Sequence, residues 1–106
     1  MDELNDDRAI LTVTQTVDES GFVVLGLRGE LDFSTSAEVR DAVSRLVEAQ
    51  VPGLIFDLTE LSFSDSSGIS VMLFAHNNLP DVRLRHPSSI VERAIQTMGL
   101  AEVLQS

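Results

Sequence analysis

The chain lacks cysteine, and its 106 residues include only seven cations, all of them arginine. Without cysteine there is no disulfide scaffold, thiol nucleophile, zinc ribbon or iron–sulfur site. The arginines are scattered, and against 17 aspartates and glutamates they leave a net charge of −10. Binding to nucleic acid phosphates needs a basic stripe, so we expect no direct contact with nucleic acid.

Long hydrophobic runs are also missing. The longest are Phe22–Leu25 and Val71–Ala75, far short of the roughly 20 apolar residues that span a bilayer. Residues 1–8 are acidic, the opposite of the positive region that opens a signal peptide, and neither end carries a lipidation motif. We therefore expect a cytoplasmic protein without membrane contact.

The composition is that of one globular domain, with 43% hydrophobic and 23% charged residues. A domain of this size buries roughly 60–70% of its unfolded surface, enough for a core without cross-links. We predict a flexible N-terminus over residues 1–9 and a single domain over residues 10–106.

The first half of the chain begins with a predicted hairpin. Leu11–Val17 alternates apolar and polar residues, with Leu11, Val13 and Val17 on the buried side, which is typical of a half-buried strand. The turn residues Asp18–Gly21 follow, and Phe22–Arg28 predicts the second strand. Because the turn is short, an antiparallel pair is favoured.

A strand–helix–strand unit follows. Thr35 and Glu38 have the spacing of a capping box, and one apolar helix face continues until Pro52-Gly53. Its members are Val39, Val43, Leu46 and Val47. Leu54–Leu58 is nearly all apolar, as in a strand covered on both faces, and Thr59–Ser64 is interpreted as a connector. Such a unit implies a right-handed crossover between parallel strands.

Two more helices flank a short strand, Val82–Arg85. The second helix opens at Asp65–Gly68 and is broken by Asn77–Asp81; its predicted buried face holds Ile69, Met72, Leu73 and, at the margin, His76. The third is capped by Ser88 or Ser89, with Glu92 completing a capping box if Ser89 is the cap. Its predicted apolar stripe is Ile90, Ala94, Ile95 and Met98, with Gly99 as C-cap and Leu100–Leu104 as a docked tail. The order of elements predicts an α/β fold with a mixed sheet of four or five strands.

The most informative segment is Leu61–Ile69. Asp65, Ser66 and Ser67 are three capping candidates in a row, where a helix needs one. Ordinary capping is the simplest interpretation. The alternative is a modification site, because a hydroxyl at the positive end of a helix lies beside free N–H groups that stabilise an added phosphate. Gly68 would then leave backbone space for another molecule.

Enzymatic and metal sites are disfavoured. His76 is about two and a half turns from Ser67 on the same helix, too far to activate it, and His86 ends a strand. Asp32, Asp57 and Asp65 all fall near predicted strand ends, but no Gly-Lys phosphate loop accompanies them. Turn and capping chemistry explain Asp32 and Asp65, and Asp57 is interpreted as a polar residue near its strand's end. We expect no enzyme, no catalytic residue, no metal and no cofactor.

Two motifs together carry a family resemblance. Gly29-Glu30-Leu31-Asp32, with Thr35 three residues on, precedes Phe63–Ile69 by about 30 residues, and Ser88–Leu100 ends in Met-Gly-Leu. Over residues 10–104 this resembles the STAS domain family, and especially the bacterial anti-sigma factor antagonists. The resemblance implies a STAS-like mixed sheet of four to five strands, with three to four helices packed mainly on one face.

The resemblance also implies a partner switch. In such a protein the unphosphorylated form binds an anti-sigma factor that is also a serine kinase of the GHKL class, which frees a sigma factor. The kinase phosphorylates one serine at the start of the second helix, here Ser67, which switches binding off, and a serine phosphatase restores it. By the same resemblance the free protein is a monomer, and the residues implied in partner binding are Asp32, Ser34, Thr35, Asp65, Ser66, Ser67, Gly68 and Ile69.

The stretch from Ser67 to Pro87 is several residues shorter than usual in this family, and Asn77–Asp81 replaces a common Gly-Gly turn. This departure affects the expected partner more than the fold. An alternative function is a STAS domain that serves as a non-switching structural or regulatory subunit, for example of a transporter ATPase complex. Ser67 disfavours it, because such a subunit needs no hydroxyl there. An enzyme or nucleotide-binding module is a third possibility, and the lack of a phosphate loop, of a base near Ser67 and of a general-acid pair disfavours it.

Overall fold

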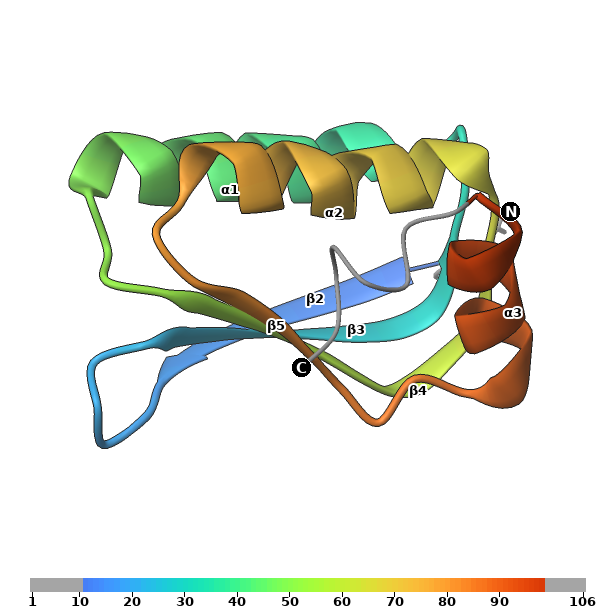
Figure 1. Ribbon diagram of the computed structural model, residues 1–106, viewed down its shortest axis with the longest axis horizontal. Helices are drawn as coiled ribbons and strands as arrows, with labels where there is room; N and C mark the ends of the chain where they lie inside the picture. Colours follow the sequence, from blue (N-terminus) through green and yellow to red (C-terminus); the bar gives the residue numbers. More distant parts are fainter. Residues whose placement is uncertain (1–10, 99–106) are drawn as a thin grey trace, which may run out of the picture.

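The computed structural model describes residues 11–98, and these form a four-stranded mixed sheet (Figure 1). Its strand order is β2-β3-β4-β5. β2 and β3 pair antiparallel, whereas β3 with β4 and β4 with β5 pair parallel. The predicted hairpin and the predicted parallel crossover are therefore both confirmed. The strands are β2 (Leu11–Val17), β3 (Val23–Leu31), β4 (Leu54–Ser64) and β5 (Val82–Arg85).

Three helices complete the described fold, and two of them cover one face of the sheet. In Figure 1, α1 and α2 lie side by side above the strands, and α3 lies at the end of the sheet beside β4. They are α1 (Ser36–Ala49), α2 (Ser66–Asn78) and α3 (Ser89–Thr97). The core lies between helices and sheet. Its fully buried members include Leu25, Phe56, Leu58, Val39, Val43 and Met72.

β4 is longer than the sequence pattern predicts. Thr59–Ser64, interpreted above as a connector, continues the strand, so that prediction was wrong. The cause is pairing with the second half of β3, where Arg28 lies opposite Glu60 after one register shift and Leu31 lies opposite Ser64 after a second. The exposed side chains of Thr59 and Glu60 break the apolar run but not the ladder. The extension carries the end of β4 level with the end of β3.

The predicted capping box at the start of α1 does not form. Thr35 is the N-cap residue but its side chain makes no capping hydrogen bond. Its hydroxyl instead donates to the Glu30 carbonyl at 3.0 Å and accepts from the Asp32 backbone N–H at 2.9 Å. Thr35 therefore braces the loop before the helix, and Glu38 has no reciprocal partner there.

The buried faces differ from the predicted ones in three elements. In α3 the core residues are Val91 and Ile95, while Ile90 and Met98 are exposed, because Ser88 is the cap and sets the helix phase. Glu92 therefore completes no capping box. Val17 at the end of β2 is exposed as well.

In α2 the buried set is Gly68, Ile69, Val71, Met72 and Ala75, with Leu73 and His76 half-buried. Val71 and Ala75 were missed and Leu73 was overestimated, because α2 packs against β4, α1 and α3 and so buries a wide face. The predicted N-terminal boundary at residues 9–10, the Gly99 cap and the tail Leu100–Leu104 lie outside the described residues. Along residues 11–98 no helix is long and apolar enough to cross a bilayer.

Candidate functional site

Two loops meet at one edge of the sheet. β3 ends at Leu31 and β4 ends at Ser64, and these two residues are partners in the parallel ladder. The Asp65 backbone N–H donates to the Leu31 carbonyl at 3.2 Å and so extends the pairing by one bond. The loop after β3 and the start of α2 are therefore neighbours, which brings together the two motifs that lie about 30 residues apart in the sequence.

Asp65 is the N-cap of α2 and also holds the other loop. Its backbone is extended, and Oδ1 of its carboxylate accepts from the N–H groups of Ser67 at 2.9 Å and Gly68 at 3.2 Å. The second oxygen, Oδ2, accepts from the backbone N–H of Phe33 at 3.2 Å. One carboxylate thus joins the two segments of the site, and the capping role predicted for Asp65 is confirmed.

Asp32 organises the loop after β3. Its Oδ1 accepts from the Ser34 backbone N–H at 2.9 Å, from the Ser34 hydroxyl at 2.8 Å and from the Thr35 N–H at 3.2 Å. The hydrogen bond from the Ser34 hydroxyl, supported by those from the backbone, lowers the pKa of the Asp32 carboxyl despite partial desolvation. The loop is therefore fixed by an ionised aspartate, and Asp32, Ser34 and Thr35 form one hydrogen-bonded turn.

Ser66 and Ser67 do not cap α2. Asp65 alone supplies the capping oxygen. Within the described residues, neither serine hydroxyl has a protein hydrogen-bond partner. Ser66 is exposed, and Ser67, in the first turn of α2, is half-buried. Capping therefore explains only one of the three candidates, and it leaves two hydroxyls at the positive end of a helix.

Gly68 and Ile69 support the site from within. Both are buried, and Ile69 is fully so. A methyl group at Gly68 would collide with the Ser64 hydroxyl and come within 2.7 Å of Leu31 Cγ. The space that Gly68 leaves is thus filled by the ends of β3 and β4, and it sets how closely the start of α2 approaches the sheet. The prediction that Gly68 leaves this space for another molecule is therefore wrong, because Ser64 and Leu31 occupy it.

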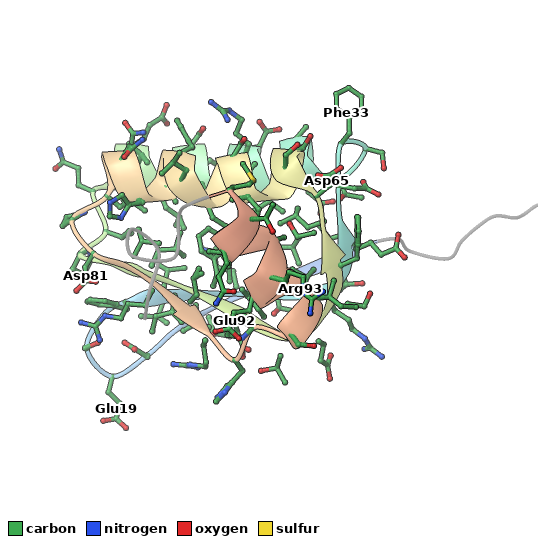
Figure 2. All side chains as sticks on the ribbon, turned by 45° about the vertical axis from the view of Figure 1, so that its right-hand side comes forward. Glu19, Phe33, Asp65, Asp81, Glu92 and Arg93 are labelled. Atoms are coloured by element: carbon green, nitrogen blue, oxygen red, sulfur yellow. The ribbon has the colours of Figure 1, made fainter. Side chains whose placement is uncertain are left out.

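Phe33 belongs to this site and was missed by the sequence argument. It follows Asp32 in the loop, and its side chain is 84% exposed. Figure 2 shows the ring standing away from the ribbon, with Asp65 below it at the start of α2. A phenylalanine among turn-forming residues is the sequence signal that could have identified it, since an aromatic ring in a polar turn has no obvious core to enter.

Asp57 lies away from the other two aspartates. It precedes Asp65 by eight residues of strand, about 25 Å at ~3.3 Å per residue. Its predicted position near a strand end was wrong because β4 continues past it. Its carboxylate accepts from the Thr59 hydroxyl at 2.6 Å, and this bond lowers the pKa of Asp57. Over residues 11–98 no three His, Asp or Glu side chains are placed to hold a metal ion.

Comparison with known proteins agrees with this architecture. The family model described as the STAS domain matches residues 12–105. An anti-sigma F factor antagonist from Lysinibacillus sphaericus is 34% identical over 83 residues, which cover 74% of this chain and 71% of that protein. The anti-sigma-F factor antagonist RsfB from Mycobacterium tuberculosis is 28% identical over 93 residues, covering 84% of this chain and 76% of RsfB.

Two solved structures of one protein are also similar. The anti-sigma factor antagonist SpoIIAA in its unphosphorylated form superposes with a TM-score of 0.78 at 27% identity, covering 89% of this chain and 86% of that one. The Bacillus cell fate determinant SpoIIAA in the phosphorylated form superposes with a TM-score of 0.71 at 26% identity, covering 89% of each chain. The same fold therefore accommodates both states of SpoIIAA.

Proposed function

The chain belongs to the STAS domain family, and from that premise we propose that it is an anti-sigma factor antagonist. It is a cytoplasmic binding protein rather than an enzyme. Its unphosphorylated form binds an anti-sigma factor and so frees a sigma factor. The observation that carries the proposal is the position of Ser67. Its hydroxyl does not cap α2, and it lies at the start of that helix, which Asp65 links to the loop after β3.

Phosphorylation of Ser67 is the proposed switch. A phosphate adds about −1.5 to −2 charges at pH 7. In the free protein this group is solvated and lies at a helix N-terminus, which tolerates anions. The fold therefore has no need to rearrange when Ser67 is modified, in keeping with the SpoIIAA fold being similar in both of its states.

The same phosphate is costly inside an interface. A desolvated dianion without a cationic partner costs several kcal/mol, and a few kcal/mol changes an affinity by a factor of about 10². The contacting residues we propose are Asp32, Ser34, Thr35, Asp65, Ser66 and Ser67, which surround the modification. Gly68 and Ile69 act beneath them by holding the helix start. The partner we propose is a GHKL-class serine kinase that is itself the anti-sigma factor, with a serine phosphatase as the opposing enzyme.

Phosphosite mapping tests the proposal most directly. The protein is isolated from its own cells during growth and under stress, and its phosphopeptides are measured by mass spectrometry. We expect a phosphate on Ser67 whose occupancy changes with the condition. If Ser67 stays unmodified throughout, the switch is wrong, and a non-switching subunit of a larger complex becomes the better explanation.

A binding experiment tests the electrostatic part. Ser67→Asp is compared with Ser70→Asp, which adds the same charge at an exposed position of α2 outside the proposed contacting residues. The purified GHKL anti-sigma factors of the source organism are the binding partners. We expect Ser67→Asp to weaken binding at least about 100-fold, with Ser67→Ala unchanged. Equal affinity of Ser67→Asp and wild type would refute release by charge.

A further inference from the structure

One aromatic ring in the described structure stands apart from the other phenylalanines. Phe56 is fully buried. Phe22 and Phe74 are half-buried, and each lies beneath an arginine guanidinium, at 5.2 Å and 4.2 Å from the ring centre. Phe63 is 41% exposed, whereas Phe33 is 84% exposed. The ring of Phe33 therefore contributes almost nothing to the core, although it exposes a large apolar area.

The loop that carries Phe33 is firmly held. The Asp32 carboxylate accepts hydrogen bonds from Ser34 and Thr35, which follow Phe33 in the chain. The Thr35 hydroxyl donates to the Glu30 carbonyl, which precedes Phe33. The backbone N–H of Phe33 itself is fixed by Asp65 at 3.2 Å. An exposed ring on a preorganised loop loses little conformational entropy when it binds. Such a ring is positioned for an intermolecular contact.

The surroundings of Phe33 specify the chemistry of that contact. The loop after β3 and the start of α2, residues 29–38 and 61–69, contain Glu30, Asp32, Glu38 and Asp65 but no arginine or lysine. An apolar ring framed by carboxylates is complementary to an apolar pocket whose rim carries cations. The backbone N–H groups of Phe33 and Ser67 donate to the same Asp65 carboxylate, so the loop that carries the ring and the proposed modification site are neighbours.

We infer that Phe33 is the apolar anchor of the docking face and inserts into an apolar, cation-rimmed pocket of the anti-sigma factor. This inference rests on the proposed function and adds to it a contact residue and the character of the partner's surface. Aromatic residues at the centre of an interface commonly dominate its affinity, and carboxylates at the rim mainly steer and orient.

Affinity measurements on matched variants test the anchor. The probes are the purified GHKL anti-sigma factors of the source organism, each titrated with the full-length protein. Phe33→Ala is compared with Ile90→Ala, which removes an apolar side chain of 58% exposure from α3. We expect Phe33→Ala to weaken binding about 30-fold or more, Phe33→Leu to weaken it less, and Ile90→Ala to leave it unchanged.

A spectroscopic measurement tests directly whether the side chain at position 33 is covered by the partner. The chain contains no tryptophan, so Phe33→Trp labelled with 5-fluorotryptophan has a single ¹⁹F resonance. We expect that resonance to shift on addition of the anti-sigma factor and to become shielded from a soluble paramagnetic agent, while an Ile90→Trp control stays accessible.

The outcomes separate the two claims. If wild type binds but Phe33→Ala binds within twofold of it and the fluorine label stays accessible, the anchor is refuted and the proposed function stands. If wild type binds none of the anti-sigma factors, both fail together. Strong loss with Phe33→Ala and shielding of the label support both.

Discussion

The carboxylate of Asp65 accepts a hydrogen bond from the backbone N–H of Phe33, 32 residues earlier in the chain, at 3.2 Å. Its other oxygen caps α2 through the N–H groups of Ser67 and Gly68. One side chain therefore sets both the start of the helix and the position of the exposed loop. Helix capping and loop position are coupled at this point, so a change at Asp65 acts on both.

Substitution of Asp65 separates its two roles. Asp65→Asn keeps one oxygen that can cap α2 but replaces the acceptor for Phe33 by an amide donor. We expect Asp65→Ala to lower the free energy of unfolding by about 1–2 kcal/mol through loss of the cap, and Asp65→Asn to lower it by less. Urea unfolding followed by far-UV circular dichroism measures both. Amide exchange at Phe33 should accelerate in both variants, and slow exchange at Phe33 in Asp65→Asn would contradict the link.

Removal of the Ser67 hydroxyl should barely affect stability. Since Asp65 provides the cap and the described residues offer the hydroxyl no partner, we expect Ser67→Ala to change the free energy of unfolding by less than about 0.5 kcal/mol. Ser66→Ala, at the exposed neighbouring position, serves as the comparison. If Ser67→Ala alone lowered the free energy of unfolding by more than about 1 kcal/mol, the Ser67 hydroxyl would have to make a stabilising contact in the folded protein.

Gly68 is required by packing. In Gly68→Ala the new methyl group meets the Ser64 hydroxyl and Leu31, both at the buried ends of strands. We expect a loss of about 1–3 kcal/mol in the free energy of unfolding. Ser70→Ala, an exposed position one turn from the helix start, should be neutral or slightly stabilising because alanine favours helix. An equally stable Gly68→Ala would show that α2 can move away from the sheet without cost.

Much of the fold follows from local patterns in the sequence. Strand alternation in β2 and β5, the apolar run at the start of β4 and the helical spacing in α1 each predict the element that forms. The extension of β4 through Thr59–Ser64 does not follow from such patterns. It depends on pairing with β3 after two register shifts, a long-range property that exposed polar side chains conceal.

The site shows the same division. Asp32, Asp65 and Ser67 could be chosen from turn and capping chemistry, which acts over a few residues. Whether Thr35 caps α1 could not be predicted, because its hydroxyl has a competing acceptor in the Glu30 carbonyl. The backbone position of Phe33 is fixed by a hydrogen bond to Asp65, which joins residues far apart in sequence. Helix phase in α3 likewise depended on which of two serines is the cap, and this decided that Val91 rather than Ile90 is buried.

The Asp32 turn predicts a defined response to acid. Hydrogen bonds, first of all from the Ser34 hydroxyl, lower the pKa of the Asp32 carboxyl. A carboxyl whose pKa is lower in the folded than in the unfolded state stabilises the protein fully above its unfolded pKa, about 3.9 in peptides. That contribution is lost as the pH falls through the lower, folded pKa. We therefore expect the loop to remain ordered at pH 4 and to loosen in more acidic solution.

Titration of the Asp32 carboxyl carbon by NMR measures this effect at the residue itself. In Ser34→Ala the first of the stabilising bonds is gone, and the pKa of Asp32 should rise toward its ordinary value, while the backbone donors keep part of the shift. Ser62→Ala is the matched control, because the Ser62 hydroxyl donates to the Gly29 carbonyl at 2.9 Å instead of to Asp32. The same pKa for Asp32 in wild type and Ser34→Ala would contradict this expectation. It would show that the backbone N–H groups alone lower the pKa of Asp32 and determine how the loop responds to acid.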